Sequence, residues 1–262
     1  MMLLQQELDQ LKQFNGKQND QKVFSLYLDT RPEQGEKWKI ELKNALQDLA
    51  KRTKNSNNHE EKNQSKDIIK KVEKRLQDLE PDFKNGVLLF ITSDESLWFE
   101  QLVNVPIETE FNWGDTPKLD QLKSLTERYP YTGIVVLQQD KARVIETEIG
   151  IAIGEYDYTL DLDTNDWRQH QGPQGDDYTQ GGAKRDEFKA RVKANQERWL
   201  KSLTSIVEKT SKKNGWQQLY LAGEKEEVEK LRSMFNVEID KVTPSNILKS
   251  NTTEIIKKVM ET

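Results

Sequence analysis

The part of the sequence best suited to chemistry is a glycine-rich loop followed by a long basic helix. The stretch from Trp167 to Trp199 contains Gly181 and Gly182, where the missing Cβ lets the backbone approach a partner closely. The first-turn amides of a helix that begins near Lys184 are unpaired and lie at the positive end of its dipole. Such a segment is suited to contact phosphate groups.

Charged and aromatic side chains in the same stretch strengthen this interpretation. Between residues 184 and 213, ten Lys or Arg residues stand against four Asp or Glu, although the whole chain has a net charge of -5. A chain segregated in this way can present one basic face and repel nucleic acid elsewhere. Trp167, His170 and Tyr178 can stack on bases. The alternative is a solvated helix whose charges only keep the protein soluble.

Apolar patterns on both sides of this stretch predict the elements that must position it. In the first half, alternating or continuous apolar residues indicate strands, and a spacing of three or four indicates helices. The predicted strands are 23–29, 86–91 and 97–105, and the predicted helices are 1–14, 36–53, 69–79 and 119–125. The polar run 54–65, which contains His59, predicts a flexible loop, and 113–117 predicts a turn.

The second half predicts strands and helices in alternation, which is typical of an α/β domain. The predicted strands are 134–137, 142–149, 151–158, 219–222 and 237–242. Helices are expected at 184–213 and 224–235, and a helix pair or one kinked helix at 244–260. Pro130 and Gly133 predict a boundary between domains 1–130 and 131–262. The second domain then carries the glycine-rich loop (165–184) and the basic helix (184–213), which Asn214-Gly215 should end.

Composition excludes several classes of protein. The chain has no cysteine, so disulfides, thiolate metal sites and cysteine nucleophiles are absent. No run approaches the roughly 20 apolar residues that span a bilayer. The N-terminal sequence lacks the features of a secretory signal. We therefore expect a cytoplasmic bacterial protein that does not use the membrane.

Several motifs, taken in order along the chain, carry a resemblance to a known family. They are Val23–Leu28, Gly181-Gly182-Ala183-Lys184, Arg185–Arg191, Asn195–Arg198 and Leu219–Gly223. This order resembles the bacterial relatives of the archaeal and eukaryotic class-1 release factors and of Pelota. The resemblance covers most of the chain, and its force lies in the order of the motifs.

The resemblance implies a fold, a site and partners. The second domain should be a ribonuclease-H-like α/β domain with a mixed sheet and flanking helices, like the central domain of release factors. It should place its glycine-rich loop near the peptidyl-transferase centre, in ribosome rescue, hibernation or termination-like release. The partners would be the ribosome, rRNA and peptidyl-tRNA, with no DNA, cofactor or metal. The expected RNA-binding residues are Gly181, Gly182, Lys184, Arg185, Lys189, Arg191, Lys193 and His170.

Two departures from the family pattern bear on catalysis. Ala183 stands where the family has the Gln that helps to place the hydrolytic water. Gln180, Gln171 or Gln174 could substitute, or these could be ordinary polar loop residues. The chain also shows no codon-reading motif and has no room for the family's GTPase-recruiting domain. We therefore expect a rescue or hibernation role rather than the reading of stop codons.

Other functions stay open at this level. Peptidyl-tRNA hydrolysis through a displaced Gln is one alternative, and a metal-dependent nuclease is another. The acidic residues that could bind a divalent cation are Asp157, Asp161, Asp163 and Asp166. His170 near Asp176 and Asp177 could act as a general acid–base site. A scaffold that only binds RNA or protein is the third alternative.

Overall fold

The computed structural model describes residues 3–16, 20–54, 58–160, 167–170 and 185–261. For residues 3–7, 167–170, 185–196 and 261, the description is limited to the backbone. The chain forms two compact units, Met1–Leu125 and Thr126–Thr262. Within the described residues, no helix has the length and apolar character needed to cross a membrane.

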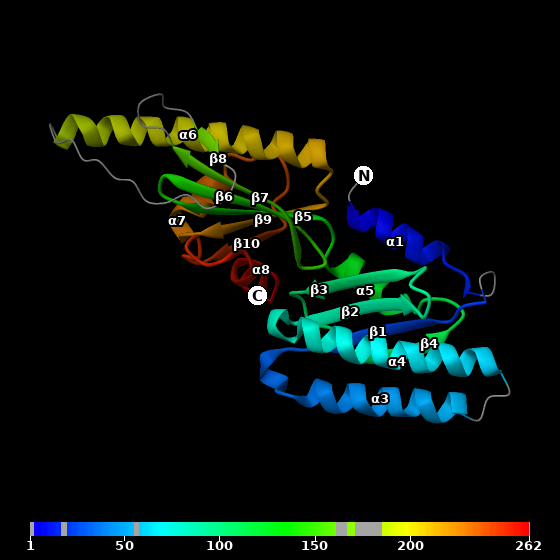
Figure 1. Ribbon diagram of the computed structural model, residues 1–262. Helices are drawn as coiled ribbons and strands as arrows, with labels where there is room; N and C mark the ends of the chain where they lie inside the picture. Colours follow the sequence, from blue (N-terminus) through cyan, green and yellow to red (C-terminus); the bar gives the residue numbers. More distant parts are fainter. Residues whose placement is uncertain (1–2, 17–19, 55–57, 161–166, 171–184, 262) are drawn as a thin grey trace. The chain divides into compact units, whose positions relative to one another are not determined.

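The first unit is built on a four-stranded antiparallel sheet (Figure 1). Its strands are β1 (Val23–Asp29), β2 (Gly86–Thr92), β3 (Trp98–Val103) and β4 (Glu110–Gly114). They are arranged in the order β3-β2-β1-β4, so β1 and β2 are central and β4 forms one edge. Every residue of β2 is buried, as its continuous apolar sequence predicts.

Helices cover this sheet. They are α1 (Leu3–Gln13), α3 (Lys37–Lys54), α4 (His59–Leu79) and α5 (Asp120–Arg128), with short 3-10 turns at η1 (Pro32–Gln34) and η2 (Glu80–Asp82). The apolar stripes of α3 and α4 pack on one face of β1 and β2, where Leu46, Ile68 and Leu89 belong to one buried core. On β1, Tyr27 donates a hydrogen bond to the Lys118 carbonyl oxygen at 2.7 Å.

Two predictions for this unit are wrong. Residues 59–65 form the first turns of α4 instead of a flexible loop, because Asn58 caps the helix by accepting hydrogen bonds from the amides of Glu60 and Glu61. Residues 113–117 are not all turn, because Trp113 and Gly114 complete β4, which pairs with β1. The alternation of Phe111, Asn112 and Trp113 is too short to distinguish a strand from a turn.

The second unit is built on a six-stranded mixed sheet. Its strands are β5 (Thr132–Gln138), β6 (Lys141–Glu148), β7 (Ile151–Leu160), β8 (Trp167–His170), β9 (Gln218–Gly223) and β10 (Lys241–Pro244). Strands β5 to β8 are antiparallel neighbours, whereas β9 runs parallel to both β5 and β10. The strand β8 lies within a segment predicted to be irregular throughout.

Helices lie on both faces of this sheet, so the predicted mixed α/β fold is confirmed. They are α6 (Arg185–Asn214), α7 (Lys225–Arg232) and α8 (Thr252–Glu261). Helices α6 and α7 share one core with the sheet, and α8 packs on the other face, where Ile255, Ile256 and Val259 are fully buried. The helical prediction for 244–260 is too long, since α8 begins only at Thr252.

Strand β6 ends in a buried carboxyl group that lacks a hydrogen-bond partner on one oxygen. The side chain of Glu148 is 8% exposed, and its Oε2 atom has no partner among the described residues. Burial raises the pKa of the Glu148 carboxyl above its ordinary value, because the charged form loses its hydration. A carboxyl of this kind holds its proton more tightly in the folded protein than in the unfolded chain.

This arrangement makes the stability depend on pH in a defined direction. Stability should fall as pH rises through the window between the unfolded and the folded pKa of Glu148, because the unfolded chain loses its proton first. The Glu148→Gln variant removes this effect. The free energy of unfolding of the variant minus that of the parent protein should be larger at about pH 8 than at about pH 4. Urea titrations at both pH values measure it.

The exposed Glu73 of α4 supplies the control for this experiment. Glu73→Gln should show little change relative to the parent across the same pH range. An equal pH response of the two variants would contradict the assignment to Glu148.

Candidate functional site

The structure describes part of the predicted site. Gly181, Gly182, Lys184, Gln180 and Gln171 lie outside the described residues. Other predicted residues lie on elements whose backbone is described. They are His170, the last residue of β8, and four cations in α6: Arg185, Lys189, Arg191 and Lys193. The glycine-rich segment is therefore bounded by β8 on one side and α6 on the other.

Helix α6 is fixed to the domain by the apolar face of its C-terminal half. Leu200, Leu203 and Val207 are 0–4% exposed and pack against the strands β5, β6 and β9. Burying side chains of this size contributes about 1.5–3 kcal/mol each relative to leaving them exposed. Figure 1 shows α6 running along the sheet, and the helix also contacts β8. Trp199, one position before Leu200, is also buried.

The helix ends where the sequence predicts. Gly215 has a φ of 75°, which is favourable for glycine, and its amide donates to the carbonyl oxygen of Ser211 at 2.8 Å. The following Trp216 lies over β5 at Gly133, where a Cβ atom would come within 2.1 Å of the indole ring. A side chain at Gly133 would therefore displace the segment that follows α6.

A buried carboxylate joins the end of α6 to the sheet. Glu146 of β6 is 6% exposed, and Asn214, the last residue of α6, donates a side-chain hydrogen bond to its Oε1 atom at 2.5 Å. The Tyr131 hydroxyl donates to the other oxygen, Oε2, at 2.6 Å. Burial and then this hydrogen bond raise the pKa of Tyr131, so its hydroxyl keeps the proton that it donates.

The surface of α6 that faces away from the sheet carries a basic stripe. Its exposed cations in the described part of the helix are Arg198, Lys201, Lys209, Lys212 and Lys213. They lie opposite Leu203 and Val207 on the helix, because the buried and exposed positions alternate with helical periodicity. These cations belong to the basic excess of residues 184–213, although none of them is among the predicted site residues. Their position makes the described half of α6 suitable for contact with phosphate groups.

The acidic residues proposed for metal binding are placed differently. Asp157 lies on β7, where its carboxylate accepts hydrogen bonds from the Arg143 guanidinium at 2.7 and 3.3 Å. Asp161, Asp163 and Asp166 lie outside the described residues. Within the described part of the chain, no group of three or more Asp, Glu or His residues is positioned to hold a metal ion. Asp157 thus has a structural partner already.

Comparison with known proteins agrees with the fold of the second unit. The family model described as bacterial archaeo-eukaryotic release factor family 5 matches residues 130–261. The chain is also 29% identical over 244 residues to YocB of Bacillus subtilis (strain 168), which is described as an uncharacterized protein; the match covers 92% of each chain.

Two solved structures are similar at lower levels. The crystal structure of the archaeal translation termination factor aRF1 has 14% identity and a TM-score of 0.36, covering 97% of this chain and 72% of that one. A structure described as an archaeal protein has 15% identity and a TM-score of 0.33, covering 97% and 69%. Since the family model matches half of the sequence, the chain belongs to the bacterial archaeo-eukaryotic release factor family.

Proposed function

We propose that this protein is a ribosome-associated translation factor that acts in ribosome rescue, hibernation or a termination-like release step. It binds RNA through the basic surface of α6 and brings the glycine-rich loop near the peptidyl-transferase centre. Membership in a release factor family supports the choice of the ribosome as partner.

The observation that carries this proposal is how α6 is held. Its C-terminal half is buried on the sheet, and Asn214 is tied to the buried Glu146. Its N-terminal end, at Arg185, follows the glycine-rich segment directly. A helix of 30 residues is about 45 Å long. A loop at the end of such a helix can reach a recessed RNA site while the domain stays outside.

The basic residues supply the affinity in this proposal. Each phosphate contact by Lys or Arg releases counterions, so binding should weaken steeply as salt concentration rises. The net charge of -5 opposes nonspecific binding elsewhere on the chain. These two effects together favour one orientation on the ribosome.

Charge reversal at the start of α6 tests ribosome binding. We expect the full-length protein to sediment with 70S particles, and the Lys189→Glu, Arg191→Glu, Lys193→Glu variant to bind at least about tenfold more weakly. The slope of log affinity against log salt should fall in magnitude by about three, one for each lost phosphate contact. Sedimentation at several salt concentrations measures both quantities.

A matched variant distinguishes a specific surface from total charge. Lys66, Lys70 and Lys74 are exposed on α4 of the first unit, and their reversal changes the net charge equally. We expect this control to keep ribosome binding. Absence of the parent protein from ribosomes in both growth and stationary phase would count against the proposal, as would equal losses in the two variants.

A second experiment tests where the loop goes. Ala183→Gln restores the Gly-Gly-Gln sequence of release factors next to Gly181 and Gly182. If the loop lies near the peptidyl-transferase centre, this variant should release peptide from a stalled ribosome complex at least about tenfold faster than the parent, since placing a reacting water is worth a large rate factor. Ala183→Asn, whose amide is one carbon shorter, is the control.

The alternatives predict different outcomes. Release by the parent protein that is lost in Gln180→Ala or Gln171→Ala would indicate a hydrolase with a displaced glutamine. Mg²⁺-dependent RNA cleavage that requires Asp161, Asp163 or Asp166 would indicate a nuclease. Equal and negligible release by the parent and by the Ala183→Gln variant, on ribosomes that bind both, would exclude the proposed position of the loop.

A further inference from the structure

The last residue of α6 belongs to a dipeptide that can modify itself. In an Asn-Gly sequence, the backbone nitrogen of the glycine can attack the side-chain carbonyl carbon of the asparagine, because glycine has no Cβ to hinder the approach. The sequence contains three such pairs, Asn15-Gly16, Asn85-Gly86 and Asn214-Gly215. Asn214 is half-buried, and its side-chain nitrogen Nδ2 donates a hydrogen bond to Glu146 at 2.5 Å. This nitrogen is the atom that leaves in the reaction.

The reaction needs no enzyme and no cofactor. The Gly215 nitrogen gives up its proton and forms a bond to Cγ of Asn214. The side-chain nitrogen Nδ2 takes up a proton and leaves as ammonia, so a cyclic imide replaces the amide. Water then opens the imide at one of its carbonyl groups, which gives either aspartate or isoaspartate. In isoaspartate the backbone runs through the side-chain carbon atoms. Water is therefore the only co-reactant.

Hydrogen bonds in the last turn of α6 control this reaction. The Gly215 amide donates to the carbonyl oxygen of Ser211 at 2.8 Å, and the Trp216 amide donates to the same oxygen at 3.1 Å. While Gly215 donates this bond, its nitrogen keeps its proton and cannot attack Asn214. The ends of helices open at a lower free energy than the rest of a domain. Each opening of the last turn frees the Gly215 nitrogen for the reaction.

Asn85-Gly86 lies in a part of the chain that does not open in this way. Asn85 is 5% exposed, and its side-chain nitrogen donates to the carbonyl oxygen of Asn104 at 2.6 Å. Gly86 begins β2, a central strand that pairs with both β1 and β3. Freeing the backbone of Gly86 requires these strands to separate, at a cost that approaches global unfolding. Of these two pairs, the structure therefore favours reaction at Asn214.

The product of the reaction lies against a buried carboxylate. Glu146 is 6% exposed, and aspartate at position 214 places a second carboxylate where the donor of its hydrogen bond was. Two carboxylates this close in a buried site repel each other unless they share a proton. Isoaspartate also lengthens the backbone and moves Trp216, whose ring packs tightly on Gly133. Either product weakens the contact between the end of α6 and the sheet.

We propose that Asn214 is a deamidation site, and that its conversion to aspartate or isoaspartate releases the end of α6 from Glu146. The rate of this modification depends on how often the last helical turn opens, so the modified fraction increases with the age of the protein. Modified copies keep the apolar packing of α6 but lose the hydrogen bond that fixes its end. This inference does not depend on the binding of RNA by α6.

Peptide mapping measures the modification directly. The full-length protein is incubated in mildly alkaline buffer, and mass spectrometry of a digest measures aspartate and isoaspartate at positions 214 and 85. We expect Asn214 to react at least about tenfold faster than Asn85, because a helix end opens more often than a central strand. In concentrated urea the two sites should react at similar rates. The proposal is overturned if Asn214 in the folded protein does not react, or reacts no faster than Asn85.

The Asn214→Asp variant tests the consequence of the modification. Since the two neighbouring carboxylates repel each other, the folded variant retains a proton that the unfolded chain releases, and stability is lost as pH rises. We expect the unfolding equilibrium constant of the variant to exceed that of the parent at least about tenfold in mildly alkaline buffer. The difference should shrink in acidic buffer, where the pair holds a proton. Urea titrations in both buffers measure it.

Asn236 supplies a matched control. Its side-chain nitrogen also donates to a glutamate, Glu208, at 3.3 Å, but this pair is exposed to solvent. Asn236→Asp should change the unfolding equilibrium constant by less than about twofold, because water and salt screen exposed charges. Equal effects of the Asn214 and Asn236 substitutions would overturn the proposed release from Glu146. An Asn214→Asp variant as stable as the parent in mildly alkaline buffer would do the same.

Discussion

The packing of α6 on the six-stranded sheet is the constraint on which the second unit depends. Leu203 and Val207 are fully buried between the sheet and the helix, so α6 cannot shift along its axis without exposing apolar surface. Hydrogen bonds to Glu146 also fix the orientation of the C-terminal end of α6, because its two oxygens accept hydrogen bonds from Asn214 and Tyr131. Losing either donor would leave a buried carboxylate oxygen unpaired, which is costly. The fixed C-terminal half of α6 therefore determines where the N-terminal end of this helix lies in the second unit.

Much of this fold could be predicted because apolar periodicity reports burial directly. The strand β1 was predicted with its observed bounds, and the predicted ends of β2, β5 and α6 lie within two residues of the observed ones. Their apolar residues face a core, so pattern and structure follow from the same cause. The predicted elements were wrong where a single polar side chain or a strand pairing determines the secondary structure. Asn58 caps α4 ten residues before Ile68, the first core-facing isoleucine of the helix, and β4 is recognised only through its pairing with β1.

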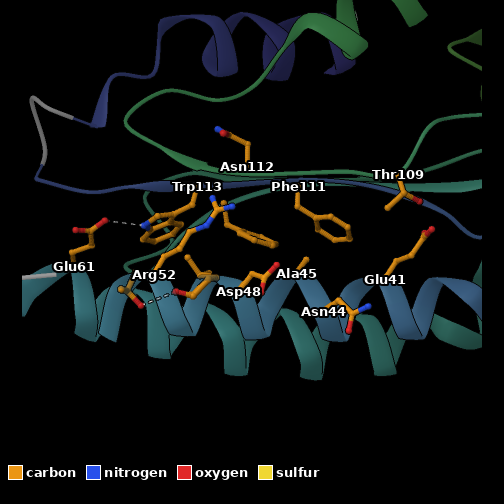
Figure 2. Close-up of a pocket in the computed structure, with 13 residues that line it drawn as sticks. Glu41, Asn44, Ala45, Asp48, Arg52, Glu61, Thr109, Phe111, Asn112 and Trp113 are labelled. Carbon is orange, nitrogen blue, oxygen red and sulfur yellow. Dashed lines mark hydrogen bonds between the residues drawn. The ribbon is translucent and has the colours of Figure 1, made fainter. Parts of the chain in front are cut away.

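The sites differ in how much the sequence could predict. The glycine-rich loop and the cations of α6 are contiguous in the chain, so their motif was visible in the sequence, and the role of these residues stays a prediction. The residues that line the pocket between β4 and α3 of the first unit are not contiguous in the chain (Figure 2). Trp113 and Asp48 come from a strand and a helix more than sixty positions apart, and only the sheet order brings them to one surface. Likewise, nothing in the sequence around Glu146 indicates that Asn214 is its partner.

The parallel pairing of β5 with β9 has a consequence for synthesis of the chain. Thr132 pairs with Gln218, and the intervening residues include the whole of α6. Contacts this distant in sequence form slowly, because a long loop must close first. Until β9 has been synthesised, one edge of the apolar strand β5 is unpaired. Unpaired apolar strands of this kind can bind other chains and aggregate. Nascent copies of this protein would therefore benefit from chaperone protection during this interval, and the requirement ends when β9 is inserted.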